Sequence, residues 1–417
     1  MRNRVKELVI VAAALAVLAP AAARAVEWKA GAWDLSFSGN VNAFGTYQMC
    51  GTSTAVIQGV PLACSKATGS PNQFSIESGL LPSALVLGAK TRARDLDTAV
   101  TLGLYPGLHV SDTRTGAGSN NNFSVDVRQL FLTVGDKSWG TIKLGKDLGL
   151  FGSDVILSDM LLLGVGAGSH NSLNHNVTLG HIGSGYIYAD WIPQLSYMTP
   201  SLGGLTFTVA VVEGFSNNGD NGVTGFLVDN VNVRNPTPGV QGRVAYDFSG
   251  PVSGRAWAGG MYQNAKLDAP PANPSLNSYA GEAGVKMNVG GLGAMAYGYV
   301  GEGIGTTLIG LDATPGTVDG HSIEARESYG YLGQVTYQIP STRLRPGVSY
   351  GKSYLNLAKG EVNPQFLRSN ELVSTALFYS VTDALTMTVE YDHVRSANQA
   401  GFEANANSIA LGGIFFF

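Results

Sequence analysis

The side chains that most often carry reaction or metal chemistry are sparse in this chain. His170 and His175 stand five residues apart in a polar stretch, with no acidic residue beside them to complete a metal site. The glycines of residues 164–168 suggest a phosphate-binding loop by composition, but the preceding strand and following helix that such a loop requires are absent. The sequence therefore favours neither an enzyme, nor a cofactor, nor a metal site.

The N-terminal segment is typical of a secretory signal peptide. Three basic residues in the first six positions precede an apolar run from Leu8 to Leu18, and Ala23-Arg24-Ala25 fits a small-x-small cleavage site. The run is shorter than the roughly 20 residues that span a bilayer. We therefore expect residues 1–25 to be removed and residues 26–417 to form the mature domain. The mature chain would hold 22 basic and 29 acidic residues, a balance that does not favour a nucleic-acid partner.

Cys50 and Cys64 are the only cysteines in the sequence. In a protein exported to an oxidising compartment, this pair predicts a disulfide that closes a loop. The alternative is a metal-binding or nucleophilic cysteine, which would need a nearby histidine or a second cysteine pair. Neither lies near Cys50 or Cys64 in the sequence.

Composition and alternation favour membrane strands. The chain has 55 glycines and only 13% charged residues, and it lacks long helical periodicity. At the C-terminus, Phe415 and Phe417 end a segment of alternating parity. An aromatic last residue is typical of the strand that closes an outer-membrane barrel, because that strand must pair with the first strand and leave no edge in lipid. A soluble sandwich would also alternate, so the connections have to decide.

Short and long connections alternate along the chain. Tight turns are predicted at residues 94–97, 135–138, 201–204, 249–251, 290–291, 340–342 and 382–383. Long polar loops are predicted near 49–72, 107–122, 149–185, 214–238, 264–277, 302–325, 357–369 and 395–404. This order is typical of membrane hairpins with short periplasmic turns and long external loops. We predict an all-β fold, a transmembrane antiparallel β-barrel of about 16 strands, multi-pass in the cell outer membrane.

Strand parity also predicts a group of basic side chains on the inner face of the barrel. Lys90, Arg92 and Arg94 share a parity and are candidate lumen-lining residues. Arg92 and Arg94 also adjoin a predicted turn, where exposure to the periplasm would explain them equally well.

Four segments resemble the general Gram-negative trimeric porins. They are residues 37–40, residues 87–90, the hairpin of residues 128–132 and 139–146, and residues 194–200 with 203–205. The resemblance implies a sixteen-stranded homotrimer whose third loop folds inward and narrows the channel. That loop would be residues 149–185, and its apolar residues between 156 and 165 support an inward fold, since outside they would form an exposed patch.

The resemblance also implies a charged constriction. Arg128 and Lys146 stand where the family has wall arginines, and His181 stands where another arginine is usual. Asp154 and Asp159 are the candidate loop carboxylates, and opposed charges of this kind set a transverse field. Asn40, a lumen-lining candidate, replaces a common lysine, so a less charged constriction is expected.

The implied function is passive diffusion of small hydrophilic solutes and ions through a water-filled channel, with outer-membrane lipid around the barrel. A substrate-specific channel is one alternative, and a continuous line of lumen aromatics would favour it. A barrel that displays its loops for adhesion or binding is another, and it would need a plugged lumen. The sequence does not indicate the solute or the charge selectivity.

Overall fold

The structure is a computed structural model that describes residues 25–64, 72–108, 125–168, 177–214, 233–267, 275–314 and 324–417. Residues 1–24 of the predicted signal peptide lie outside the described residues. The strands are β1 (Val26–Ala30), β2 (Trp33–Cys50), β3 (Asn72–Glu77), β4 (Ala84–Ala93), β5 (Leu96–Pro106), β6 (Val125–Asp136), β7 (Gly140–Leu148), β8 (Trp191–Met198), β9 (Leu205–Val212), β10 (Val233–Arg234), β11 (Gly239–Phe248), β12 (Val252–Leu267), β13 (Ser275–Val289), β14 (Leu292–Glu302), β15 (Glu327–Tyr337), β16 (Leu344–Leu355), β17 (Leu367–Ser380), β18 (Leu385–Asn398) and β19 (Glu403–Phe416).

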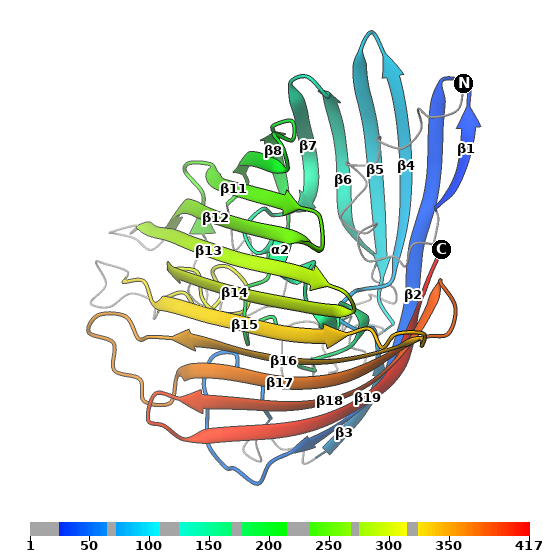
Figure 1. Ribbon diagram of the computed structural model, residues 1–417. Helices are drawn as coiled ribbons and strands as arrows, with labels where there is room; N and C mark the ends of the chain where they lie inside the picture. Colours follow the sequence, from blue (N-terminus) through cyan, green and yellow to red (C-terminus); the bar gives the residue numbers. More distant parts are fainter. Residues whose placement is uncertain are drawn as a thin grey trace.

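These strands form one closed antiparallel barrel of sixteen strands with two additional strands, β1 and β10 (Figure 1). Strands β3 and β4 are two pieces of one barrel strand, because both pair with β2. The predicted fold class is confirmed. All seven predicted short turns fall where neighbouring strands join, and the eight predicted long connections fall at the junctions between them. The last of these is short, because β18 and β19 extend into the predicted loop and leave only residues 399–402 between them. No helix in the described part of the chain is long and apolar enough to span a membrane.

The last strand closes the barrel on the first long strand. β19 pairs with β2 from Ala406 opposite Cys50 to Phe416 opposite Asn40. Gly39 N donates to Phe417 O at 2.9 Å, and Phe417 N donates to Gly39 O at 3.1 Å. A Cβ atom on Gly39 would lie 2.1 Å from Ala84 O, so the close approach of the strands here requires glycine. The predicted pairing of the C-terminal strand with the strand around residues 33–47 is confirmed.

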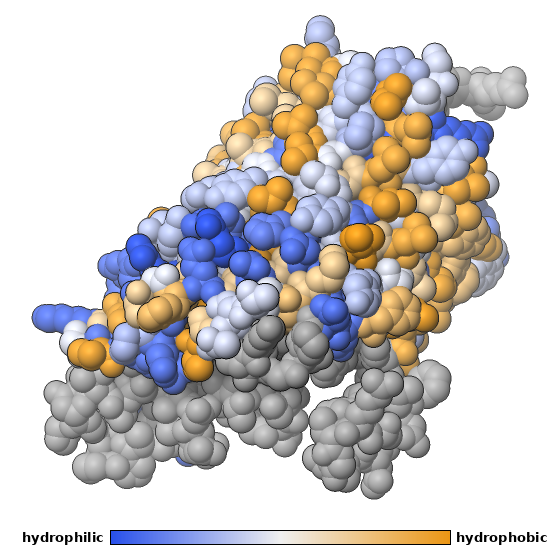
Figure 2. Space-filling view, turned by 90° about the horizontal axis from the view of Figure 1, so that it is seen from below, coloured by the Kyte–Doolittle hydropathy of each residue, from blue (hydrophilic) through white to orange (hydrophobic). Residues whose placement is uncertain are grey.

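Strand parity separates an apolar outer wall from a polar inner wall. On β2 the outward side chains Val41 and Tyr47 are exposed, whereas the inward side chains Asn42 and Thr46 are buried inside the barrel. This alternation is expected when one face meets lipid and the other meets the lumen. Apolar side chains cover a broad area of the visible face of the molecule (Figure 2).

The connection between β7 and β8 runs from residue 149 to residue 190, five residues beyond the predicted end, and its described residues, 149–168 and 177–190, fold into the barrel as predicted. It is called the inward loop below. It contains helix α2 (Ser153–Ile156) and the 3-10 helix η2 (Met160–Leu163), and Figure 1 shows α2 within the ring of strands. Its apolar side chains, including Val155 and Leu161, pack with inward residues of the wall such as Phe378. Burial of this apolar surface holds the loop inside.

Two features were not predicted. β1 pairs with Trp33–Phe37 of β2, beside the end of β19, so it occupies the place that a longer β19 would have taken. Residues 78–83 interrupt the barrel strand between β3 and β4. Their side chains Leu80 and Leu81 are buried in the same apolar cluster as the inward loop.

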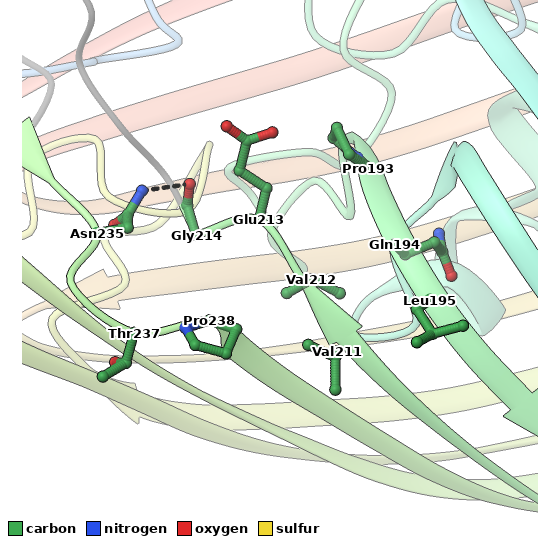
Figure 3. A pocket seen from close by; sticks show the side chains of 10 residues that line it. All are labelled: Pro193, Gln194, Leu195, Val211, Val212, Glu213, Gly214, Asn235, Thr237 and Pro238. Atoms are coloured by element: carbon green, nitrogen blue, oxygen red, sulfur yellow. Dashed lines mark hydrogen bonds between the residues drawn. The ribbon is translucent and has the colours of Figure 1, made fainter.

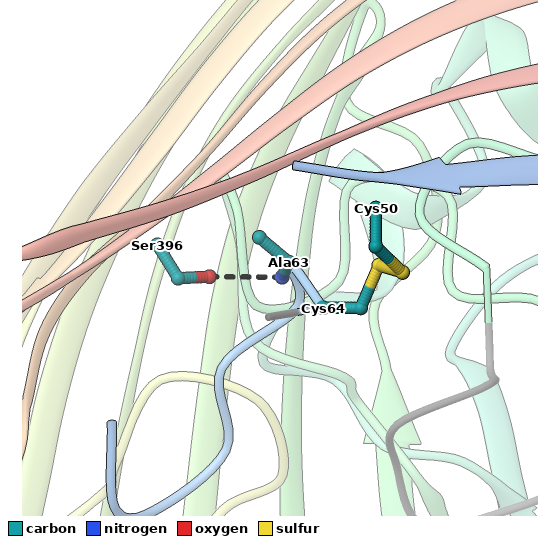
Figure 4. Close-up of a disulfide and its surroundings, with 4 residues drawn as sticks. All are labelled: Cys50, Ala63, Cys64 and Ser396. Atoms are coloured by element: carbon teal, nitrogen blue, oxygen red, sulfur yellow. Dashed lines mark hydrogen bonds between the residues drawn. A yellow bond between two sulfur atoms is a disulfide. The ribbon is translucent and has the colours of Figure 1, made fainter. Parts of the chain in front are cut away.

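The predicted disulfide between Cys50 and Cys64 is present. It holds the end of the segment of residues 51–64 against inward side chains of β17 and β18, and Figure 4 shows the disulfide beside the contact of Ala63 with Ser396. Ala63 N donates to Ser396 Oγ at 2.9 Å, and Leu62 N donates to Asn370 Oδ1 at 3.1 Å. The disulfide therefore fixes a connection that packs on the inside of the barrel.

Replacing both Cys50 and Cys64 with alanine is expected to loosen residues 51–64. In the chain-entropy model, closing a loop of about this length contributes about 3 kcal/mol to stability. The variant should unfold at a lower temperature in detergent and be cleaved faster by a nonspecific protease within residues 51–64. Wild-type protein treated with a reductant is the control and should behave like the variant. Equal unfolding temperatures and cleavage rates in all samples would contradict this account.

Candidate functional site

The backbone of the inward loop is held by polar side chains from the opposite wall. Its amides donate to Gln241 of β11, Glu282 of β13, Gln334 of β15, Ser353 of β16 and Glu390 of β18, at distances from 2.5 to 3.2 Å. Buried amides need acceptors because an unpaired one is costly. The polar inner wall supplies these acceptors and so fixes the path of the loop across the lumen.

Asp154 of α2 forms ion pairs with the wall. Its carboxylate lies 2.8 Å from Arg243 Nη1 of β11 and 2.9 Å from Arg255 Nη1 of β12. Arg255 also pairs with Asp247 of β11 at 2.7 Å. The predicted loop carboxylate thus meets wall cations, but on different strands from those predicted. Strand parity could have identified Arg243 as an inward cation, because its parity on β11 is opposite to that of the outward residues Val240 and Tyr246.

Asp159 accepts hydrogen bonds from donors within the inward loop itself. It accepts from Leu161 N at 2.9 Å, from the Tyr186 hydroxyl at 2.8 Å and from His181 N at 3.3 Å. Asp159 is buried. Its carboxylate is occupied by the loop's own donors, so this geometry does not support its predicted role as a carboxylate facing the channel.

His181 is fully buried between the inward loop and β16. Its Nε2 lies 2.8 Å from Ser349 Oγ, and its Nδ1 lies 3.4 Å from Ser184 O. Burial lowers the pKa of the His181 ring, although the nearby Asp159 opposes the shift. The ring is therefore neutral near pH 7, and its position does not support the predicted role as a wall cation.

Arg128 lies on the inner side of β6, at an irregularity in the pairing with β5. Its Nε is 2.9 Å from Asp126 Oδ2, and its guanidinium lies over the Tyr105 ring at 5.3 Å. Tyr105 in turn packs on Trp191, the first residue of β8. Arg128 therefore lies inside the barrel as predicted, with its charge already paired.

Lys146 stands directly opposite Leu130, in the set of outward residues that includes Ile142 and Leu144. Its Nζ lies 3.9 Å from Asp126 Oδ1. The inward lysine of β7 is instead Lys143, which pairs with Asp147 and lies over the Phe131 ring. Lys146 thus has the outward register, but its side chain reaches the Asp126 carboxylate that also pairs with the inward Arg128, so the register alone does not exclude it from the lumen.

The lumen candidates on β4 divide into two groups. Lys90 and Arg92 have the inward parity of β4, and Arg92 pairs with Asp97 at 2.6 Å and Asp136 at 2.8 Å at the short-turn end. Arg94 lies in the turn itself with φ of 50°, so it does not line the lumen.

Asn40 is inward but covered. Its Nδ2 donates to Pro82 O at 3.1 Å, and its Oδ1 accepts from Asn42. It holds the segment of residues 78–83 against β2, so it is not in contact with the open lumen.

A cleft of about 500 Å³ lies where the ends of β8 and β9 meet residues 235–238 (Figure 3). Asn235 Nδ2 donates to Gly214 O at its rim. Of the described residues that line it, Glu213 is the one charged residue, and none is a histidine, cysteine or serine. Among the described residues, no three potential ligands lie together to hold a metal ion. The cleft offers no reaction chemistry.

A family model described as Gram-negative porin matches residues 11–399. The chain belongs to the Gram-negative porins. The family and the closed barrel make it an outer-membrane channel rather than an enzyme. Its short turns accordingly face the periplasm.

Solved structures similar to this porin share its fold at low sequence identity. The outer membrane channel DcaP of Acinetobacter baumannii has a TM-score of 0.69 and 18% identity, with 94% of this chain and 99% of that chain covered. An anion-selective porin from Comamonas acidovorans has a TM-score of 0.57 and 13% identity over 92% and 100%. A trimer form of OmpT from Vibrio cholerae has a TM-score of 0.53 and 13% identity over 93% and 100%. A search of curated proteins found no match.

The buried His181 predicts an acid-sensitive loop. A group whose folded-state pKa is lowered contributes stability above its unfolded pKa of about 6.5 and loses it as the pH falls. The unfolding temperature of wild-type porin should therefore decrease more between pH 7 and roughly pH 5 than that of His181→Gln, whose amide does not titrate there. Circular dichroism in detergent measures both. Parallel decreases in the two proteins would contradict a buried neutral ring.

Proposed function

We propose that this porin forms a water-filled channel for the passive diffusion of small hydrophilic solutes and ions. This proposal rests on the observation that charged side chains on the inner wall remain exposed to solvent. Asp247 retains 51% of its side-chain exposure and Arg255 retains 38%, although both have inward parity. Charges on the inside of a membrane barrel require water around them.

The inward loop supports a filtering role. It crosses from β7 and β8 to acceptors on β11, β13, β15, β16 and β18, so it occupies part of the lumen cross-section. Asp154 bonds directly to Arg243 and Arg255 rather than facing them across an open gap. The loop therefore narrows the passage, and the charges beside it act on solutes that pass its edge.

The structure offers little support for a substrate-specific channel. The inner wall holds a row of aromatic rings, in which Trp257 packs near Tyr297 and Tyr297 near Tyr299. All three side chains are buried beneath the inward loop. They pack the loop against the wall and do not form an exposed path for a solute. No specific observation favours adhesion.

We also infer a homotrimer. A trimeric form exists for the OmpT protein that shares this fold. In this chain, large apolar side chains are exposed on the outer face near the closing seam, among them Tyr47, Phe74, Ile76 and Leu411. Such a surface suits either lipid or neighbouring subunits.

Purified porin in a planar lipid bilayer should give stepwise current increases that scale with the conductivity of the salt solution. In vesicles, the uptake rate of uncharged sugars should fall smoothly with their size and not distinguish stereoisomers. Heat-denatured porin in the same detergent is the control. Absence of current steps from folded protein would contradict a diffusion channel, and strong preference for one stereoisomer would favour a substrate-specific one.

A further inference from the structure

A group of cations lies on the inner wall near the periplasmic turns. Arg243, Arg255, Lys286 and Arg345 come from β11, β12, β13 and β16. Arg255 and Lys286 are directly opposed across the β12–β13 pair. Arg255 shares its parity with the buried inward residue Trp257, whereas Val252 and Tyr262 of the other parity are exposed on the outer wall.

Two carboxylates offset only part of this charge. Asp154 pairs with Arg243 and Arg255, and Asp247 pairs with Arg255. Within the described part of the chain, Lys286 and Arg345 form no ion pair and no side-chain hydrogen bond. The next inward carboxylate of β13, Glu282, is buried and accepts from Gly152 N and the Tyr297 hydroxyl. Positive charge is therefore in excess around Lys286 and Arg345.

Arg255 and Lys286 are close enough to repel each other, because they are directly opposed on neighbouring strands. Like charges directly opposite each other on neighbouring strands are destabilising. Asp154 and Asp247 offset the charge of Arg255, and a counter-anion from solution would offset the positive charge that remains.

The inward loop lies beside these cations. Lys286 lies opposite Met295 of β14, and Met295 lies opposite Gln334 of β15. The side chain of Gln334 accepts a hydrogen bond from Met160 N of the loop at 2.9 Å. A Cβ atom on Gly347, two residues from Arg345, would lie 2.9 Å from Met160 Sδ. The Arg345 guanidinium lies over the Phe378 ring at 4.7 Å, which fixes its orientation and leaves its N–H donors available. A solute that passes the loop on this side meets these donors.

We propose that Arg255, Lys286 and Arg345 form an oxyanion-binding site on the periplasmic side of the inward loop. The site takes small solutes that carry a carboxylate or phosphate group. Arginine offers a planar fork of donors to such groups, and lysine adds a compact charge. This site rests on the proposed channel function and specifies the class of solute that the channel favours.

The test is block of channel current by inorganic phosphate. Phosphate is titrated against a constant potassium chloride concentration in planar bilayers, and the half-blocking concentration is measured. The double variant Lys286→Gln with Arg345→Gln should raise this concentration about tenfold or more, as expected when at least one charged contact is lost. Its reversal potential in a salt gradient should also shift toward cations.

Two further variants separate the site from general effects of charge. Lys137→Gln with Lys359→Gln removes two positive charges from exposed positions in a periplasmic turn and an external loop, and should leave phosphate block unchanged. Lys286→Arg keeps the charge, so phosphate should block its current at the same half-blocking concentration as in the wild type. Normal current with the same half-blocking concentration in the wild type and in the Lys286/Arg345 double variant would overturn the site alone. Absence of current from the wild type would contradict the channel and the site with it.

Discussion

The pairing of β19 with β2 is the constraint on which the rest of the structure depends. In lipid no water is present to satisfy an open strand edge, so a membrane sheet must close on itself. The reciprocal hydrogen bonds between Gly39 and Phe417 lie at the end of this strand pairing. Closure also fixes parity, because a slip of one residue would exchange the inner and outer faces of a strand. The inward position of Arg255 and Lys286 follows from that register.

The inward loop depends on closure in turn. Only a closed wall brings β11, β13, β15, β16 and β18 within reach of a connection that begins at the end of β7. The acceptors Gln241, Glu282 and Gln334 then pair with loop amides, and the apolar side of the loop is buried against the wall. Stability and the proposed function share these contacts, because the same loop that packs against the wall occupies part of the lumen and presents Asp154 to the wall cations.

Local patterns in the sequence were sufficient for the strands, the turns and the disulfide, because each depends on nearby residues or on parity. The inward fold of the loop came from the family resemblance, with the loop's apolar residues as support. Local patterns were not sufficient to predict the roles of single loop residues, because these roles depend on partners that are distant in the sequence. Nothing near Asp159 indicates that Tyr186 and His181 donate to it, and nothing near His181 indicates that Ser349 of β16 covers its ring. Family resemblance directed attention to Lys146, which lies opposite the outward Leu130 but reaches Asp126, the partner of the inward Arg128. Arg243 and Arg255 became visible as partners of Asp154 only in three dimensions.

The most direct test of this account is whether the inward loop contacts the inner wall at β16. Met160 and Gly347 can each be replaced by cysteine, since the loop approaches the wall closely there. A short cysteine-reactive crosslinker added to folded porin should join positions 160 and 347, as detected by mass spectrometry of linked peptides. The pair Met160→Cys with Leu87→Cys, which places the second thiol on the outer wall, should stay unlinked. Free labelling of both cysteines without a link between 160 and 347 would contradict the inward loop and the passage built around it.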